Sequence, residues 1–297
     1  MRDIWKLSRN VSMSKISSDF HRIMRKVPWI PLVILLIFIV FGIFGSHLVP
    51  HDPLKTNLGF TLMPPFWQKG GSLEYPLGTD STGRDVLSRL IVGASVSLKV
   101  GFGVIIISAF IGAIIGLLSG YLGGWVDMVL MRITDIFFSL PALLFAIVIA
   151  SILGPGLTNM IIVLAVLGWA GYARILRGEV LRIKQGDFIS LAVVAGASKR
   201  RIMWRHLFPN IVNTMVVIAS FHLGNAIVAE SSLSFLGVGV PPPTPAWGSM
   251  CAIGRDYLYS AWWLATFPGL AIFLVVMSTN LLGDWLRVRL DPKFRQL

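Results

Sequence analysis

Charged side chains are scarce in this sequence, at 13% of its 297 residues. A soluble domain has about 25%, and a chain at half that level lacks the polar surface needed to face water. The hydrophobic share of 55% also excludes an intrinsically disordered chain, because disorder requires low hydrophobicity. The composition therefore predicts a membrane protein.

Acidic residues are the scarcer charge class, since 14 Asp and Glu accompany 26 Lys and Arg, for a net charge of +12. Such an excess can indicate nucleic-acid binding, because Lys and Arg neutralise phosphates. In a chain this hydrophobic it is better explained by the Lys and Arg bias of cytoplasmic loops. Membrane lipid is thus an expected partner, and nucleic acid is not.

Metal-binding and nucleotide-binding patterns are also missing. Cys251 is the single cysteine, so the chain can form neither an internal disulfide nor a cysteine-based metal site. His47 and His51 are four residues apart, but Pro50 breaks the helix that would place them on one face. No G-x-x-x-x-G-K-[ST] pattern is present, so we expect no cofactor and no catalysis on this chain.

Long apolar runs are what the sequence does contain. Six charge-poor stretches of roughly 17 to 25 residues are long enough to cross a hydrocarbon core about 30 Å thick as helices. Solid apolar runs lack the alternation of barrel strands, so the predicted fold class is an all-α membrane protein. The predicted spans are residues 29–45, 96–118, 136–153, 157–173, 211–229 and 262–282.

The distribution of Lys and Arg predicts the orientation. Of the 26, 20 lie in segments on the side of the N-terminus and five on the other side, so both termini are expected in the cytoplasm. The predicted divisions are a cytoplasmic segment at 1–28, the first membrane helix with an outer loop at 29–94, and a core at 95–297. We expect the first span to remain as an anchor rather than to be removed as a signal peptide.

The outer loop is rich in Pro and Gly, which predicts an ordered cap built of turns. Within it, residues 84–91 have apolar side chains at helical spacing, and a short amphipathic helix along the membrane interface is expected.

The inner loop at about 174–210 predicts an elbow. We expect a helix over residues 188–195, a break at Gly196 and a second helix that starts at Ser198 and stops before Pro209. The Ser198 hydroxyl can cap this second helix. Such an elbow would present a small apolar surface, flanked by cations, to another protein.

At the elbow the sequence resembles the inner-membrane permease subunits of ABC importers. Their signature is Glu-Ala-Ala, three residues, Gly, nine residues and Ile-x-Leu-Pro, which is matched here by Ser190-Leu191-Ala192, Gly196, His206 and Phe208-Pro209. The spacing, glycine and proline match, whereas Ser190, Leu191, His206 and Phe208 depart from the letters. The resemblance implies that the elbow couples to an ATPase subunit through Asp187, Ser190, Ala192, Gly196, Ala197, Ser198, Arg201, His206 and Pro209.

Four further segments are similar to the dipeptide/oligopeptide/nickel branch of this family, and to its "C"-type members in particular. They are residues 76–90, 120–127, 234–248 and 283–293. The resemblance implies a multi-pass protein of a bacterial or archaeal inner membrane that pairs with a homologous permease. It also implies two ATP-binding subunits, which hold ATP and Mg, and an extracytoplasmic substrate-binding protein. Dipeptides or oligopeptides are the expected cargo, while nickel or its chelates, glutathione and cationic peptides remain alternatives.

Ionisable residues inside spans by default mark function. His222, Asn225 and Glu230 lie on or near one face of the fifth span and are candidates for the translocation path, or for polar packing between helices. The outer segments can be interpreted in two ways. They either gate the outer opening or dock the binding protein, or they are only rigid connectors. The candidates there are Asp80, Arg84, Asp85, Pro242 and Trp247.

Two pairings between residues are also predicted. Arg132 and Asp135, three apart, are expected to pair with each other. Gly112 and Gly116 are expected to allow close helix packing, either within this subunit or with its partner.

A membrane-embedded enzyme and a channel or carrier are the alternatives to an importer subunit. A membrane-embedded enzyme would need convergent acid, base or metal-binding side chains inside the spans, and the sequence has almost none. An ATPase-independent channel or carrier would be active without nucleotide, so nucleotide dependence separates it from an importer.

Overall fold

The computed structural model describes residues 27–290, so the predicted cytoplasmic segment 1–28 lies almost wholly outside the described residues. The described part of the chain is helical, with one isolated bridge between Thr79 and Asp85 and no strand. This confirms the all-α prediction. Five helical stretches are long and apolar enough to cross a membrane: α2 (Trp29–Leu48), α3 (Val86–Leu122), α6 (Leu157–Lys184), the stretch Lys199–Phe235 that ends in α9 (Phe208–Phe235), and α11 (Trp263–Leu290).

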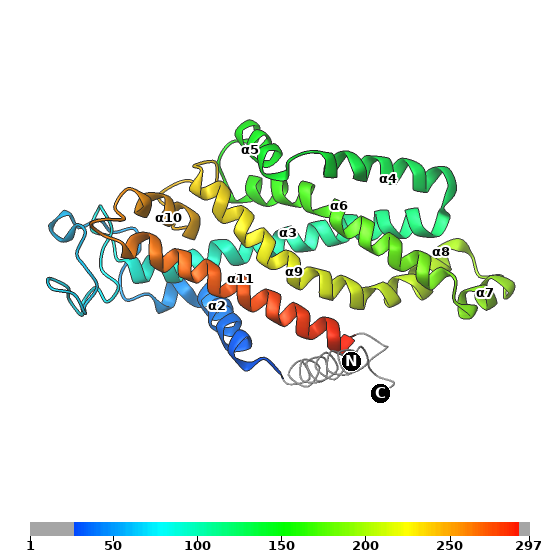
Figure 1. Ribbon diagram of the computed structural model, residues 1–297, viewed down its shortest axis with the longest axis horizontal. Coiled ribbons are helices and arrows are strands. Elements are labelled where there is room, and N and C mark those ends of the chain that lie inside the picture. Colours follow the sequence, from blue (N-terminus) through cyan, green and yellow to red (C-terminus); the bar gives the residue numbers. More distant parts are fainter. Residues whose placement is uncertain (1–26, 291–297) are drawn as a thin grey trace, which may run out of the picture.

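The predicted third span is broken in the structure. It consists of α4 (Gly124–Ser139) and α5 (Ala142–Leu153), which meet at an angle of 91°, and this pair counts as a sixth span if it crosses as one unit. The expectation of one straight helix over residues 136–153 was therefore wrong. Pro141 explains the bend, because its ring removes a helical hydrogen bond and disfavours helical geometry at Leu140, which is extended. Figure 1 shows α4 running along α6 before α5 turns away.

The longest element, α3, has 37 residues and begins in the outer loop. The expectation of a separate interfacial helix over residues 84–91 was wrong, because this segment continues without a break into the second span. Asp85 caps it by accepting hydrogen bonds from the backbone N–H groups of Leu87 and Ser88. At 1.5 Å per residue the helix is about 55 Å long, which exceeds the hydrocarbon thickness and carries it into the cap.

Close packing of α3 on α6 depends on glycines. A Cβ atom on Gly112 would overlap Tyr172, and one on Gly116 would lie 3.0 Å from the Cβ of Leu176. The predicted small-residue contact is thereby confirmed, and it lies within this subunit. It fixes the two central helices of the molecule side by side (Figure 1).

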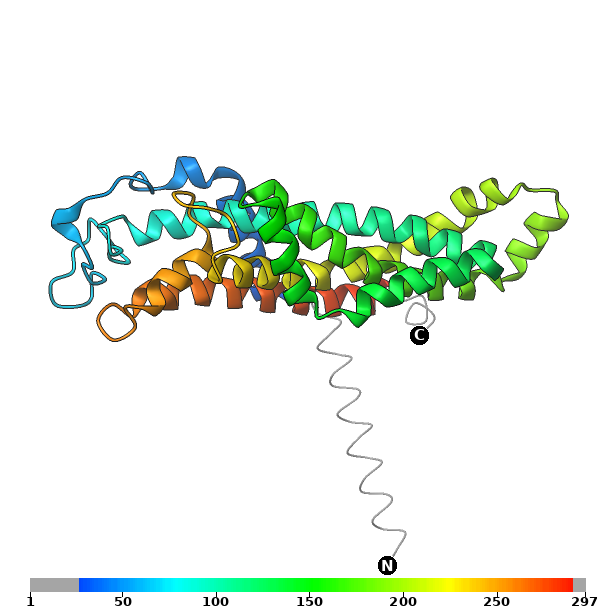
Figure 2. The same ribbon diagram turned by 90° about the horizontal axis from the view of Figure 1, so that it is seen from above.

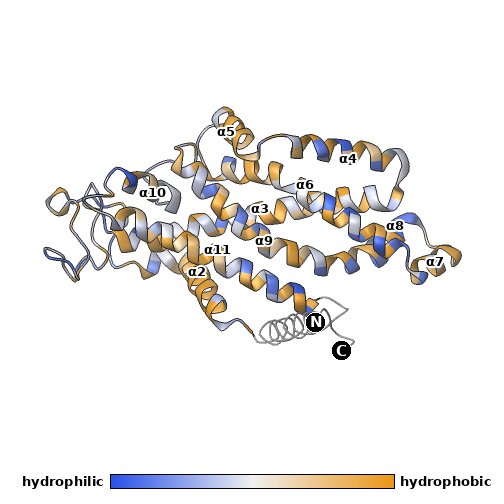
Figure 3. Ribbon diagram, viewed as in Figure 1, coloured by the Kyte–Doolittle hydropathy of each residue, from blue (hydrophilic) through white to orange (hydrophobic). Residues whose placement is uncertain are grey.

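The remaining short elements lie at the two ends of the long axis. The outer loop, with the turn η1 (Leu58–Phe60), and α10 (Trp247–Arg255) form one end, and α7 (Asp187–Val194), α8 (Lys199–Arg201) and η2 (Ile202–Leu207) form the other. Figure 2 shows the same separation from a second direction. In Figure 3 apolar residues cover the long helices and also α7, far from the bundle centre. Which end faces the cytoplasm stays a prediction.

Candidate functional site

The elbow has most of the local geometry that the sequence predicts. The helix α7 ends at Val194, and Gly196 follows with a φ of +77°, a conformation that suits glycine. Ser198 caps the next helix, as predicted, by accepting a hydrogen bond of 3.3 Å from the backbone N–H of Arg201. The break at Gly196 reverses the chain and places α7 at the tip of the molecule.

The second helix of the elbow does not stop before Pro209, so that expectation was wrong. Residues 202–207 form a π-helical turn, in which the backbone N–H of Phe208 reaches the carbonyl of Met203, and this turn runs directly into α9. Pro209 has no N–H to donate, and the wider turn is one of the few ways a helix can pass such a residue. As a result, the second helix of the elbow and the fifth span form one continuous stretch of helix, Lys199–Phe235.

The tip of the elbow exposes apolar side chains. Leu191 is 68% exposed and Val194 is 87% exposed, while Ile189, on the other face of α7, is buried in one apolar cluster with Ile202 where α7 meets α6 and η2. Exposed cations follow at Lys199, Arg200, Arg201 and Arg205, and none of them forms an ion pair with the described residues. An apolar knob on a buried anchor, next to unpaired cations, is suited to binding an acidic-rimmed groove on another protein.

The other predicted elbow residues are also at this end. Asp187 and Ser190 are exposed on α7, Ala192 and Ala197 are half-buried, and His206 is half-buried in the π turn. The carbonyl of His206 accepts a hydrogen bond from the side-chain amide of Asn210 at 2.6 Å. The structure thus brings the predicted set together around a single turn of the chain.

Two ion pairs connect α4 to α6 behind the elbow. Arg177 donates two hydrogen bonds to Asp127, at 2.5 and 2.6 Å, and Arg174 lies 2.5 Å from Asp135. The expected pairing of Arg132 with Asp135 was wrong, because Asp135 reaches α6 instead of its own helix. Sequence reasoning did not single out Asp127 and Arg177. Their only signal in the sequence was an acidic residue shortly before the predicted third span and a basic residue shortly after the predicted fourth span.

The outer cap is held by buried polar groups. Asp80 is 5% exposed, and its carboxylate accepts hydrogen bonds from Thr82 and Arg84, including one of 2.7 Å from the Arg84 guanidinium. Burial raises the pKa of Asp80, but the hydrogen bonds from Arg84 and Thr82 together outweigh it, so the pKa lies below its usual range. Arg89, also buried, lies 3.6 Å from the same carboxylate and donates to the carbonyl of Pro53.

The other outer candidates differ from one another. Asp85 is buried as the cap of α3, and Trp247 is 3% exposed with its indole N–H donating to the carbonyl of Leu90 at 2.9 Å. Pro242 is exposed, and Arg84 is partly exposed. Four of the five candidates, Pro242 being the exception, therefore make contacts that hold the cap together.

The three candidates for the translocation path do not share one face of α9. Asn225 is exposed, His222 is half-buried against the ring of Tyr172 at 4.5 Å, and Glu230 is fully buried. The Glu230 carboxylate accepts a hydrogen bond of 2.8 Å from Ser234, and Ser97 on α3 lies 3.5 Å away. Glu230 is therefore part of the contact between α9 and α3.

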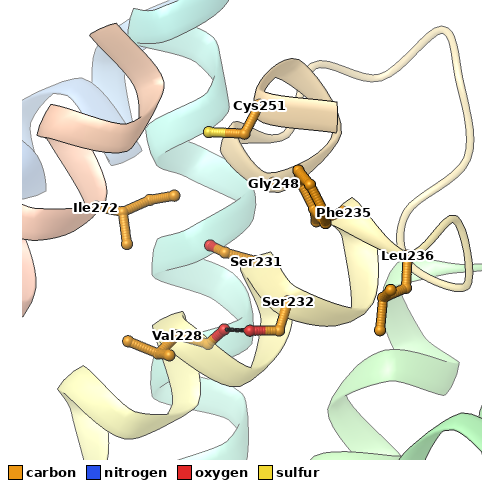
Figure 4. Close-up of a pocket in the computed structure, with 8 residues that line it drawn as sticks. All are labelled: Val228, Ser231, Ser232, Phe235, Leu236, Gly248, Cys251 and Ile272. Atoms are coloured by element: carbon orange, nitrogen blue, oxygen red, sulfur yellow. Dashed lines mark hydrogen bonds between the residues drawn. The ribbon is translucent and has the colours of Figure 1, made fainter. Parts of the chain in front are cut away.

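Among residues 27–290, no group of three or more His, Cys, Asp or Glu side chains converges so that it could hold a metal ion. A cavity of about 350 Å³ lies between α9, α10 and α11 (Figure 4). Its lining is mostly apolar, and Cys251 and Ser231 are among the few polar groups on it. Burial raises the pKa of the Cys251 thiol to about 11, which makes it a weak nucleophile.

Comparison with known protein families identifies the family of this helical chain. The model of the family "Binding-protein-dependent transport system inner membrane component" matches residues 112–296, more than half of the chain and the whole of the elbow. The chain belongs to this family. It is a permease component of the inner membrane, as the resemblance implied.

Several characterised relatives align with most of the chain. It is 41% identical over 84% of its length to the di/tripeptide transport system permease protein DppC of Pseudomonas aeruginosa, covering 82% of that protein. It is 44% identical over 84% of its length to the dipeptide transport system permease protein DppC of Escherichia coli K12, covering 83% of it. The glutathione transport system permease protein GsiD of Escherichia coli O6 is 46% identical over 76% of the chain and 75% of GsiD.

Proposed function

We propose that this chain is the membrane-spanning subunit of an ATP-driven importer of dipeptides or oligopeptides. It pairs with a homologous permease to form the pore and takes cargo from an extracytoplasmic binding protein. Two ATP-binding subunits supply the energy, and they, not this chain, bind ATP and Mg. The similarity to the two DppC proteins supports the choice of dipeptides.

The observation that carries the coupling role is the exposed apolar tip of α7 on a buried anchor. Leaving Leu191 and Val194 in water costs about 25 cal/mol for each Å² of apolar surface, so the tip is stabilised when a partner covers it. Ile189 of α7 is buried in one cluster with Ile202 of the second elbow helix, which continues into α9 without a break, so closure of the ATPase subunits would move α9 through this contact. The elbow end then faces the cytoplasm, in agreement with the Lys and Arg distribution.

The path residues take different roles in this scheme. Asn225 and His222 are candidates to face peptide in the conformation described here. Glu230 would reach the path only when α3 and α9 separate, since its hydrogen-bond partners include Ser97 on α3. At the outer end, exposed Pro242 is the candidate to contact the binding protein, while Asp80, Arg84, Asp85 and Trp247 support the cap beneath it.

The coupling role is tested with Val194→Asp, assayed for co-purification of the ATPase subunits and for peptide uptake in proteoliposomes. We expect loss of both, because a charge enters the apolar contact. Leu58→Asp is the matched control, since Leu58 is 78% exposed on the outer cap and should tolerate the same change. Normal uptake by Val194→Asp, or uptake that needs no nucleotide, would overturn the proposal, the second outcome in favour of a channel or carrier.

Glutathione is the second candidate cargo, favoured by the identity to GsiD. Competition for uptake among a labelled dipeptide, an oligopeptide, glutathione and nickel separates the candidates. We expect unlabelled dipeptide to compete most strongly. Competition by glutathione or nickel alone would replace the peptide assignment and leave the coupling role intact.

A further inference from the structure

A second cavity, of about 320 Å³, lies between α2, α3, α9 and α11. All of its lining side chains are hydrocarbon: Leu35 and Phe38 are buried at its floor, and Leu36, Ile39 and Phe102 are partly or largely exposed at its rim. No donor or acceptor side chain lines it, so it is unsuited to a peptide. We call this cavity the α2–α11 groove.

Helix geometry places the groove within one leaflet. Its α2 residues lie three to ten positions after Trp29, which is at most about 15 Å along the helix, half the thickness of the hydrocarbon core. On α11, Leu282 lies eight positions before the helix end at Leu290, about 12 Å. The groove therefore lies in the leaflet that contains the N-terminal end of α2 and the C-terminal end of α11.

Unpaired cationic and polar groups lie at that end of α11. Trp285 and Arg289 follow Leu282 by three and seven positions and so share its face. The Arg289 guanidinium lies 5.3 Å from the Trp285 ring centre, and neither Arg287 nor Arg289 forms an ion pair with the described residues. The Trp285 indole N–H is buried and has no hydrogen-bond partner among them.

An apolar slot with exposed cations about 10 Å beyond it matches the acyl chain and the headgroup of one lipid molecule. We propose that the α2–α11 groove binds the acyl chain of an anionic phospholipid whose headgroup lies at Arg287 and Arg289. The lipid fills the gap between the first span and the rest of the bundle. The assignment to the inner leaflet rests on the proposed orientation, and the site itself does not depend on which cargo is transported.

The test uses the full chain, with the subunits that co-purify, in vesicles containing a phosphatidylglycerol with a photoreactive acyl chain. Phosphatidylcholine with the same chain is the comparison lipid. We expect the phosphatidylglycerol probe to label peptides containing Leu36, Ile39 and Phe102, and unlabelled phosphatidylglycerol to compete. Arg287→Gln and Arg289→Gln should each reduce labelling about five-fold, the effect of one cation near an anionic headgroup. Arg255→Gln, at the opposite end of the molecule, is the matched control and should change nothing.

A second variant tests the slot itself. Leu36→Trp fills the rim and should abolish labelling at Phe102 while leaving the yield of assembled protein unchanged. Equal labelling by the two lipids, labelling spread over all exposed spans, or crosslinks from the groove to the partner permease alone would each overturn the proposal. Peptide uptake is measured separately, so a failure of the lipid site and a failure of the importer proposal are distinguishable.

Discussion

The two ends of the long axis use opposite chemistry. At the outer cap, charged and polar side chains are buried and paired with one another, as in the contacts of Asp80 with Arg84 and Thr82. At the elbow, apolar side chains such as Val194 are exposed, and the cations that follow α7, such as Arg200, form no ion pair with the residues that the structure describes. A buried ion pair is stabilised by its own partners, whereas an exposed apolar tip is stabilised only when another surface covers it. Exposed apolar side chains occur at both ends, as at Leu58 of the cap and Val194 of the elbow, so the difference lies in charge. The cap pairs its buried Asp80 within its own chain, whereas the cations that follow α7 are left for a partner.

The largest effect should follow from removing the central carboxylate of the cap. Asp80→Asn leaves the buried guanidinium of Arg89 and the partly exposed one of Arg84 without their charge partner, and we expect a loss of about 3 kcal/mol of cap stability. Hydrogen exchange of residues 50–90 in the purified protein measures it. Glu74→Gln, at an exposed site of the same loop, is the control. Equal protection in both variants would show that the cap is not held by Asp80.

In the elbow, truncation of a side chain should lower stability only at the buried residue Ile189. Ile189→Ala opens a cavity between α7, α6 and η2, and a local loss of about 2 kcal/mol is expected. Val194→Ala on the same helix should change stability by less than about 0.5 kcal/mol, because its side chain is in solvent. Hydrogen exchange of residues 187–202 tests both. If Val194→Ala destabilises as much as Ile189→Ala, the tip is not free in the isolated subunit.

A smaller effect is expected where the cap meets the bundle. Trp247→Phe keeps an aromatic ring next to Phe38 but removes the hydrogen bond to the carbonyl of Leu90. We expect the free energy of unfolding to fall by about 1 kcal/mol. The shift in thermal unfolding temperature in detergent measures it. Trp125→Phe is the control, because Trp125 is exposed on α4. No shift for Trp247→Phe would mean that packing alone seats the indole.

The smallest effect is the change of cap stability with pH near neutrality, which depends on the ionisation of Asp80. Its folded pKa is lowered from 3.8, so the stabilisation is fully present well above pH 3.8 and is lost as pH falls below that value. The protection factors of the cap amides should therefore fall only in acid. In Asp80→Asn this acid-dependent step should disappear. A step of equal size in the variant would show that Asp80 is not its source.

Local signals in the sequence were sufficient for parts of the elbow. Gly196 and Ser198 were placed correctly because a left-handed turn and an N-cap each depend on one residue and its immediate neighbours. The course past Pro209 was not predictable, since the same residue can end a helix or be passed by a π turn. Packing of Ile202 and Leu207 in the core favours the second outcome here.

Partner choice between elements could not be derived from spacing. Asp135 is three residues from Arg132 and 39 from Arg174, yet it pairs with Arg174 because α4 lies against α6. For the same reason Trp247 and Glu230, which are candidates for exposed function in the sequence, are buried by α3. Burial at such positions depends on a neighbour that is more than 100 residues away.

The sequence by itself determined the membrane class, the six apolar segments, the elbow helix with its glycine break and the close approach at Gly112. These depend on composition, on segment length and on local geometry, all of which act over a few residues. The tertiary structure alone decided the bend between α4 and α5, the continuity of the elbow with α9, and which charges are paired. Those features depend on which helices become neighbours, and packing of the whole chain settles that.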